Sequence, residues 1–375
     1  MRKGTLAAFA LLAACAPAAA KEFAPSTAGE IVTALREAGP GDVITIAPGV
    51  YALPPVKLDQ SGKKDGPITL RASKLGEVTL VSRGTELFKV KGSDWIFENL
   101  DIAGACADDS TCEHAFHIAG LADRVVIRHN RIRDFNAHIK GNGEATATEQ
   151  GPRIAFPYDV RIEDNWLFGT HVRHTDNPIA PVDVVGGGGW IVRGNLIADY
   201  AKTLDHPAER TDDWSYALFF KGNASKTQIE GNVVLCADRL PAQPYTRGLS
   251  LGGSATGPQY CEGSCDSDEA KEGSIGGNLV MACGAEPGIY LFRATTSEVA
   301  GNTLVGTGGI LAVAPATTGE IEGNLLGGGA ITAEKDAKLR LGANRIVGAT
   351  MVKPPPAKLQ AIAAYRAEWA RFKDR

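Results

Sequence analysis

Gly277-Asn278-Leu279-Val280 returns, with small changes, as Gly301-Asn302-Thr303-Leu304, Gly323-Asn324-Leu325-Leu326 and Ala343-Asn344-Arg345-Ile346. These four asparagines are 24, 22 and 20 residues apart. Similar asparagine steps come earlier in the chain, at Asn99, Asn130, Asn165, Asn195 and Asn232. A short repeat made of apolar runs, glycine and asparagine leaves no room for a helix and predicts a coiled β-solenoid. Successive asparagines are then expected to stack and to hydrogen-bond through their side chains.

The composition favours a solenoid and disfavours nucleic acid as a partner. The chain has 375 residues, which is long for one compact domain, but a solenoid core grows along a single axis. Glycine accounts for 44 of the 375 residues, about 12%, against an average of roughly 7%. This excess suits a chain with many tight turns. With 39 basic and 43 acidic residues, the net charge is −4, so bulk charge gives no sign of nucleic-acid binding.

Residues 1–20 have the pattern of an export signal. The basic pair Arg2-Lys3 precedes an apolar stretch, Leu6 to Ala14, that is too short to span a membrane. Cleavage after Ala18-Ala19-Ala20 is one possibility. The other is the lipobox-like Leu12-Ala13-Ala14-Cys15, which would place a lipid anchor on Cys15. We expect a protein of the periplasm, an outer-membrane lipoprotein or a secreted protein, without a transmembrane span.

The six remaining cysteines are even in number, which favours disulfides in an exported chain. Fifteen pairings are possible. The two short spacings predict the loop disulfides Cys106–Cys112 and Cys261–Cys265. Cys236 and Cys283 follow two of the repeated asparagines by four and five residues, so they are expected to meet between adjacent coils. A zinc site, formed by Cys261-x3-Cys265 with His171-x2-His174, is the alternative.

The chain divides into four segments. After the signal, residues 21–40 form an N-terminal cap in which Thr27 to Glu30 is a capping box that starts a helix. Residues 41–350 form the solenoid, and 351–375 a C-terminal helical tail that is expected to pack on the last coil, with a membrane-surface helix as the alternative. Three long insertions interrupt the repeat, within residues 141–152, 202–213 and 253–272. Long loops on a rigid stack are usual places for binding.

Three segments carry a family resemblance: Pro40-Gly41-Asp42-Val43-Ile44, Pro48-Gly49-Val50-Tyr51 and Gly66-Pro67-Ile68-Thr69-Leu70-Arg71-Ala72. They resemble the start of polysaccharide lyase family six, the group with chondroitinase B and many alginate lyases. Residues 40 to 348 resemble, more broadly, the right-handed parallel β-helices of the pectin-lyase-like superfamily. The resemblance implies an all-β fold.

The same resemblance implies candidate catalytic residues. Phe219-Phe220-Lys221-Gly222-Asn223 matches the step in which the family's lysine acts as base, and Arg247 stands near the place of its arginine, before the strand instead of after it. Trp214, Ser215 and Tyr216 stand where the family has calcium-binding acidic residues. The sequence therefore predicts no cofactor firmly. Calcium (Ca2+) is the one candidate, and Asp183 with Asp212 or Asp213 would bind it. The favoured interpretation is that Asp183 instead pairs with a lysine.

Aligning the coils predicts a row of cations. His138-Ile139-Lys140-Gly141-Asn142 aligned on Leu218 to Asn223, and again on Tyr290 to Arg293, places Lys140, Lys221 and Arg293 in one line. Parallel strands lie about 4.8 Å apart, so cations on every second coil are roughly 10 Å apart. An anionic polysaccharide could lie along such a trough and present a carboxylate near each cation.

β-Elimination from a uronate unit requires a neutralised carboxylate, a base and a proton donor. Lys221 is the candidate base, and Arg247 and Arg293 are the candidate neutralising groups. Tyr216 is the leading candidate proton donor, with Tyr290 and His138 as others. Lys140, His138, Tyr290, Asp183 and His117 are the candidate substrate-binding residues.

The sequence therefore predicts a monomeric polysaccharide lyase that acts on a uronate-containing polysaccharide. A non-catalytic glycan-binding or envelope scaffold protein is one alternative. A uronate epimerase is another, because it abstracts the same proton. A hydrolase would need two close carboxylates, and the alignment shows no clear pair on adjacent coils.

Overall fold

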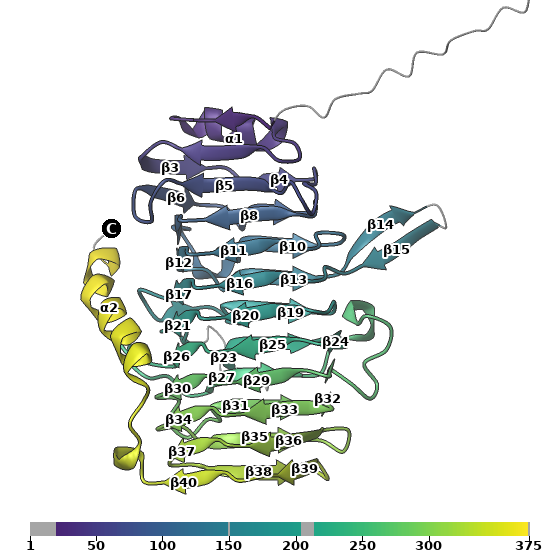
Figure 1. Ribbon diagram of the computed structural model, residues 1–375, viewed down its shortest axis with the longest axis vertical. Coiled ribbons are helices and arrows are strands. Elements are labelled where there is room, and N and C mark those ends of the chain that lie inside the picture. Colours follow the sequence, from purple (N-terminus) through teal and green to yellow (C-terminus); the bar gives the residue numbers. More distant parts are fainter. Residues whose placement is uncertain (1–19, 149–150, 204–213, 374–375) are drawn as a thin grey trace, which may run out of the picture.

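A computed structural model describes residues 20–148, 151–203 and 214–373. The signal segment with Cys15, and the candidate calcium ligands Asp212 and Asp213, lie outside these residues. The chain winds into a right-handed parallel β-helix whose faces are sheets of twelve, eleven and ten strands (Figure 1). The twelve-stranded sheet runs from β1 (Glu22–Phe23) to β39 (Lys338–Leu341), and the eleven-stranded sheet from β3 (Gly49–Leu53) to β40 (Arg345–Val347).

The ten-stranded sheet carries the candidate site. Its strands, in order along the solenoid, are β4 (Val56–Leu58), β7 (Glu86–Val90), β10 (His114–Ala119), β13 (Ala137–Asn142), β19 (Val182–Val185), β23 (Ser215–Lys221), β27 (Thr246–Leu251), β31 (Ile289–Phe292), β35 (Gly309–Val313) and β38 (Ala330–Glu334). All neighbouring pairs in this sheet are parallel. Each strand therefore presents its outward side chains in rows that run along the solenoid axis.

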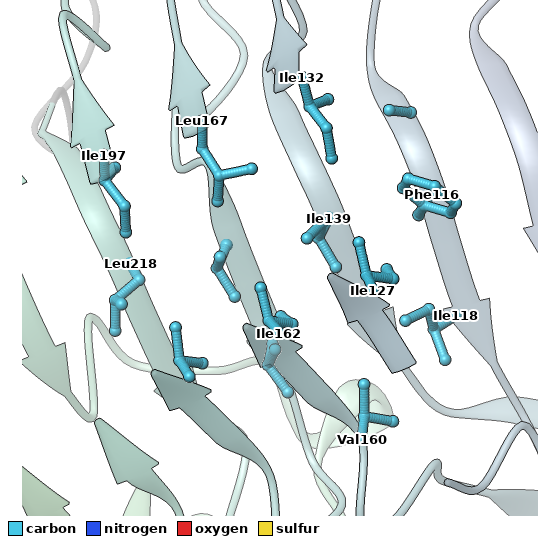
Figure 2. Close-up of a cluster of buried hydrophobic side chains, with 14 of the residues drawn as sticks. Phe116, Ile118, Ile127, Ile132, Ile139, Val160, Ile162, Leu167, Ile197 and Leu218 are labelled. Carbon is cyan, nitrogen blue, oxygen red and sulfur yellow. The ribbon is translucent and has the colours of Figure 1, made fainter. Parts of the chain in front are cut away.

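The interior is filled by columns of apolar side chains, one from each coil. Ile127, Ile162 and Val192 are in register on adjacent strands of the twelve-stranded sheet, and each is fully buried. Figure 2 shows Ile127 and Ile162 among the side chains that fill this interior. Burial of each such side chain contributes about 1.5–3 kcal/mol, so the core specifies which residues of successive coils face each other.

The predicted asparagine ladder is present. Eight buried or half-buried asparagines bond in sequence, from Asn130 to Asn344, with side-chain Nδ2 to Oδ1 distances of 2.9–3.1 Å. The amide of each also donates to a main-chain carbonyl of the preceding coil, for example Asn232 to Val192. Asn99 is not part of the ladder, because the backbone N–H of its neighbour Leu100 is what donates to Asn130.

Helix α1 (Ala28–Glu37) covers the N-terminal end of the solenoid, where Ile31 and Leu35 are fully buried, and it begins with the predicted capping box at Thr27. Helix α2 (Pro356–Lys373) forms as expected but does not pack on the last coil. It lies along the eleven-stranded sheet (Figure 1), where it contacts Phe168 and Leu196 of earlier coils. Among the described residues, no helix is long and apolar enough to cross a membrane.

All three predicted disulfides are present: Cys106–Cys112, Cys236–Cys283 and Cys261–Cys265. Cys236 and Cys283 follow neighbouring strands, β26 (Val233–Leu235) and β30 (Leu279–Met281), so this bond joins adjacent coils. The zinc alternative is wrong, because Cys261 and Cys265 are bonded to each other.

Candidate functional site

Two insertions form a groove over the middle of the ten-stranded sheet. One is the hairpin of β14 (Glu144–Thr148) and β15 (Gly151–Ala155), which projects from the solenoid (Figure 1), and the other is the loop 253–269. Between them lies a cavity of about 650 Å³. We call this cavity the groove; its lining residues are Lys140, Asn142, Gly143, Ile154, Phe156, Pro178, Asp183, Val185, Trp214, Tyr216, Phe219, Lys221, Ser254, Ala255, Thr256, Gly257, Gln259 and Tyr260.

The groove brings together four of the predicted site residues: Lys140, Asp183, Tyr216 and Lys221. Lys140 Nζ lies 2.8 Å from Asp183 Oδ1, and both side chains are largely buried. The expected lysine partner of Asp183 is therefore Lys140. The pair adds no net charge to the groove.

Lys221 projects from the outer face of β23 and is half-buried. Its Nζ donates to Ser254 Oγ at 3.2 Å and lies 5.1 Å from the centre of the Phe219 ring. The Ser254 contact comes from the loop that forms one wall of the groove. Lys221 thus has its amine inside the groove, in contact with residues that a bound chain would also touch.

The predicted single row of Lys140, Lys221 and Arg293 is wrong. Lys140 is in register with Asp183 and then with Phe219, whereas Lys221 is in register with Val185. Lys221 lies two residues beyond the row of Lys140, and Arg293 lies three residues beyond Tyr290, which stands in that row. A shift of two keeps a side chain on its own face, so the alternation of apolar and polar residues does not reveal the displacement of Lys221.

Arg293 lies outside the groove. Its backbone has a φ of 47°, and its Nη1 contacts the carbonyl oxygen of Cys265 at 3.4 Å. The guanidinium also lies 5.2 Å from the Phe292 ring. Arg293 therefore contacts the disulfide-bonded loop and not the groove. This geometry does not support the prediction that Arg293 neutralises a substrate carboxylate.

Arg247 is enclosed by aromatic rings. Its guanidinium carbon lies 4.1 Å from the Trp214 ring, 4.2 Å from Tyr290 and 5.7 Å from Tyr216, and only 8% of the residue is exposed. It also forms an ion pair with Glu286 at 3.1 Å. Burial by itself lowers the pKa of Arg247, but its polar neighbours outweigh this effect and raise it.

Arg247 therefore cannot face a bound polysaccharide directly, contrary to the prediction. Its Nη1 donates to Tyr216 Oη at 3.1 Å, so its effect on the groove passes through Tyr216. Tyr290 does not line the groove either, since its ring packs on this guanidinium. Sequence alone predicted neither contact, since Trp214, Arg247 and Glu286 come from three different coils.

The two predicted histidines have different places. His138 is wrong as a substrate contact, because it is buried and its Nε2 lies 3.0 Å from the Phe168 carbonyl oxygen. Burial lowers the pKa of His138 to about 3.

His117 lies in the row of Lys140, one coil earlier. Its Nδ1 lies 2.6 Å from Glu86 Oε1, and its Nε2 lies 2.5 Å from Asn142 Oδ1. It therefore orients Asn142 at the end of the groove.

The side chains before Lys221 do not fit the calcium ion that the family resemblance implies. Trp214 and Tyr216 contact a guanidinium, and Ser215 is 2% exposed, so none of the three offers a carboxylate. Calcium in proteins takes six to eight oxygen ligands. Within the described ranges, no group of three or more His, Cys, Asp or Glu residues could hold a metal ion.

Several groove residues were not predicted from the sequence. Ile154 comes from the hairpin, Phe156 directly follows it, and Tyr260 comes from the loop. Glu262 holds this loop in place: its Oε1 accepts from Tyr158 Oη, and its Oε2 accepts from the Gly187 N–H at 2.7 Å. The length of the insertions was the only available signal for these residues.

A second, polar cavity of about 480 Å³ lies beside the Cys106–Cys112 loop. His171 Nε2 lies 3.0 Å from Asp109 Oδ1, and the His174 N–H donates to Asp109 Oδ2 at 2.7 Å. Burial by itself raises the pKa of Asp109, but these hydrogen bonds and the charge of Arg173 lower it to about 2. The cluster connects the 3-10 helix η1 (Asp109–Thr111) to β18 (Arg173–His174), two coils further along the solenoid.

The fold defines a class: a right-handed parallel β-helix with a cavity of about 650 Å³ over one sheet, the architecture of the pectin-lyase-like proteins. The family model for Chondroitinase B matches residues 26–184. The predicted resemblance to polysaccharide lyase family six is thereby confirmed. The match includes Lys140 and Asp183 and ends before Lys221.

Solved structures agree with this class. An alginate lyase from Paenibacillus sp. str. FPU-7 is similar with a TM-score of 0.60 and 14% identity, over 85% of this chain and 99% of that one. A rhamnogalacturonan lyase gives 0.54 and 13%, over 87% and 84%. A pectate lyase gives 0.52 and 11%, over 87% and 79%. At these identities the structural similarity shows a shared fold and nothing more. No curated protein matches the chain significantly.

Proposed function

We propose that this protein is a polysaccharide lyase that cleaves a uronate-containing polysaccharide by β-elimination in the groove, with Lys221 as base. The observation that carries the proposal is the position of the Lys221 amine inside a cavity of about 650 Å³, bounded by two loops, on a β-helix like those of known lyases. The Chondroitinase B match over the first half of the chain supports the same class of chemistry.

In this mechanism Lys221 removes the proton on C5 of the uronate. The electron pair forms the C4–C5 double bond as the glycosidic oxygen leaves from C4. Tyr216 Oη donates a proton to that oxygen, and its hydrogen bond from Arg247 Nη1 stabilises the phenolate that results. Lys140 binds the uronate carboxylate while it exchanges part of its interaction with Asp183, which makes the C5 proton more acidic.

A panel of uronate polymers tests the proposal through the ultraviolet absorbance of the new double bond. Lys221→Ala is expected to lose the signal. Lys226→Ala is the matched control. Lys226 follows on the same coil, its side chain is 72% exposed, and it does not line the groove. Full activity of Lys221→Ala would exclude it as the base. Inversion at C5 without absorbance, seen by nuclear magnetic resonance, would identify an epimerase instead.

We also propose that the protein is exported and that Cys15 receives a lipid. The basic start, the short apolar stretch and the three disulfides support export. Mass spectrometry of the mature N-terminus tests this proposal: a diacylated Cys15 supports the lipoprotein, and an unmodified terminus after Ala20 supports a freely soluble exported form.

A further inference from the structure

We propose, resting on the proposed function, that the substrate is a polysaccharide of low charge density, in which single uronates are separated by neutral sugars. Three observations on the ten-stranded sheet carry this inference: the charge of the groove, the charge of the surface on either side of it, and the apolar character of its walls.

The groove holds little net charge. Its charged lining residues in the described structure are Lys140, Asp183 and Lys221, which sum to +1. The sheet residues of the groove come from three adjacent strands, β13, β19 and β23, and strands are spaced about 4.8 Å apart. A sugar adds roughly 5 Å to a chain, so a homopolymer of uronates would bring about three carboxylates to this site. Asp183 would repel at least one of them.

The N-terminal extension of the groove is also neutralised. Lys57, Lys89 and His117 precede Lys140 in the same row, on successive strands. Each has a carboxylate nearby. These ion pairs are Lys57–Asp59 at 3.1 Å, Lys89–Glu144 at 3.5 Å and His117–Glu86 at 2.6 Å, and Lys91 also contacts Glu144 at 3.2 Å. This surface therefore provides no run of uncompensated cations for successive carboxylates.

The C-terminal extension of the row carries no charge at all. After Asp183 the row continues through Phe219, Ser250, Tyr290, Leu311 and Thr332, of which the first three are buried. A polyanion that followed the sheet in this direction would lose water from its carboxylates without gaining a cationic partner. Neutral sugars have no such cost.

The walls of the groove are suited to uncharged sugar faces. The cavity is lined by Ile154 on the hairpin, Phe156 directly after it, Tyr260 on the loop and Phe219 on the sheet. Tyr260 is 61% exposed and Ile154 is 51% exposed, although both are large and apolar. Ligand sites commonly combine apolar walls with a few polar groups that set orientation. Here the apolar walls fit the neutral units, and Lys140 with Lys221 fits one uronate.

Binding and turnover on three polymers test the inference. Hyaluronan alternates a uronate with a neutral sugar, polygalacturonate has a carboxylate on every unit, and chondroitin sulfate adds sulfate to an alternating chain. Calorimetry uses Lys221→Arg, which keeps the charge but stays protonated and therefore cannot accept the C5 proton. Oligosaccharides of equal length from hyaluronan are expected to bind at least about tenfold more tightly than those from the other two. Equal or tighter binding of polygalacturonate or chondroitin sulfate overturns the inference.

A charge variant provides a second test. Asp183→Asn raises the charge of the groove by one and should shift the affinity ratio towards polygalacturonate by at least about threefold. Glu320→Gln makes the same charge change on the twelve-stranded sheet, away from the groove and its row, and should leave the ratio unchanged. Gln259→Lys adds a cation to the loop wall and replaces Asp183→Asn if that variant does not fold. An unchanged ratio in the groove variant contradicts the inference.

The outcomes separate the two proposals. If hyaluronan binds best but no polymer gives an unsaturated product, the lyase assignment fails and the inference about charge density stands. If unsaturated product forms only from polygalacturonate, the lyase assignment stands and the inference fails. If none of the three polymers binds, both are overturned.

Discussion

Asn232→Ala should strongly destabilise the β-helix, because Asn232 is a fully buried member of the asparagine ladder. Its Oδ1 accepts from the backbone N–H and the side chain of Asn195, both at 3.0 Å, and its Nδ2 donates to Val192 and Asn278, both at 2.9 Å. The substitution removes four hydrogen bonds and leaves the buried Asn195 N–H without an acceptor. At about 1–3 kcal/mol for each unsatisfied buried group, we expect a loss of about 3–5 kcal/mol.

Asn344→Ala is the matched control. Asn344 accepts from Asn324 at 3.0 and 2.9 Å in the same way, but it is half-buried at the end of the ladder, where water can replace its amide. We expect a loss of about 1 kcal/mol. Urea denaturation with the disulfides intact, followed by circular dichroism, measures both. A smaller loss for Asn232→Ala than for Asn344→Ala would refute the conclusion that the buried ladder stabilises the coil.

Three further predictions concern catalysis, pH and the disulfides. Lys221→Ala should reduce the rate of double-bond formation by about 10²–10⁴-fold, the usual effect of losing a general base, while Lys226→Ala should not change it. Asp109 has a pKa of about 2, below its usual 3.8, so its stabilising contribution is complete above pH 3.8 and is lost as the pH falls through 2. Asp109→Asn should therefore cost about 2 kcal/mol in denaturant unfolding at pH 7, and much less near pH 2. Replacing Cys236 and Cys283, 47 residues apart, by serine should cost about 4 kcal/mol, and a loss below 1 kcal/mol in thermal unfolding would contradict this estimate.

The local signals in the sequence predicted the architecture well. The asparagine period, the glycine content and the absence of helical patterns lead to a parallel β-helix, because each coil repeats the same turn chemistry. The capping box at Thr27 predicted the first helix, and the short cysteine spacings predicted two of the three disulfides. These features depend on neighbours in the sequence or on one repeated contact.

The candidate site was predicted only in part. Lys140, Asp183, Tyr216 and Lys221 do meet in one groove, but they do not form the expected row. Between Asn130 and Asn278 the insertions make the spacing of the asparagines irregular. The spacing therefore does not predict which residues of neighbouring strands are paired there. The register instead follows the packing of inward residues such as Ile139 and Val182 against each other.

The sequence by itself determined that this chain coils, where asparagine joins one coil to the next, and which loops are long enough to build a site. The tertiary structure alone decided which charges meet: Lys140 with Asp183, and Arg247 with Glu286 inside three aromatic rings. Turns and periods are encoded within about twenty residues of chain. Ion pairs across coils depend on a register that every stacked side chain of the core sets together.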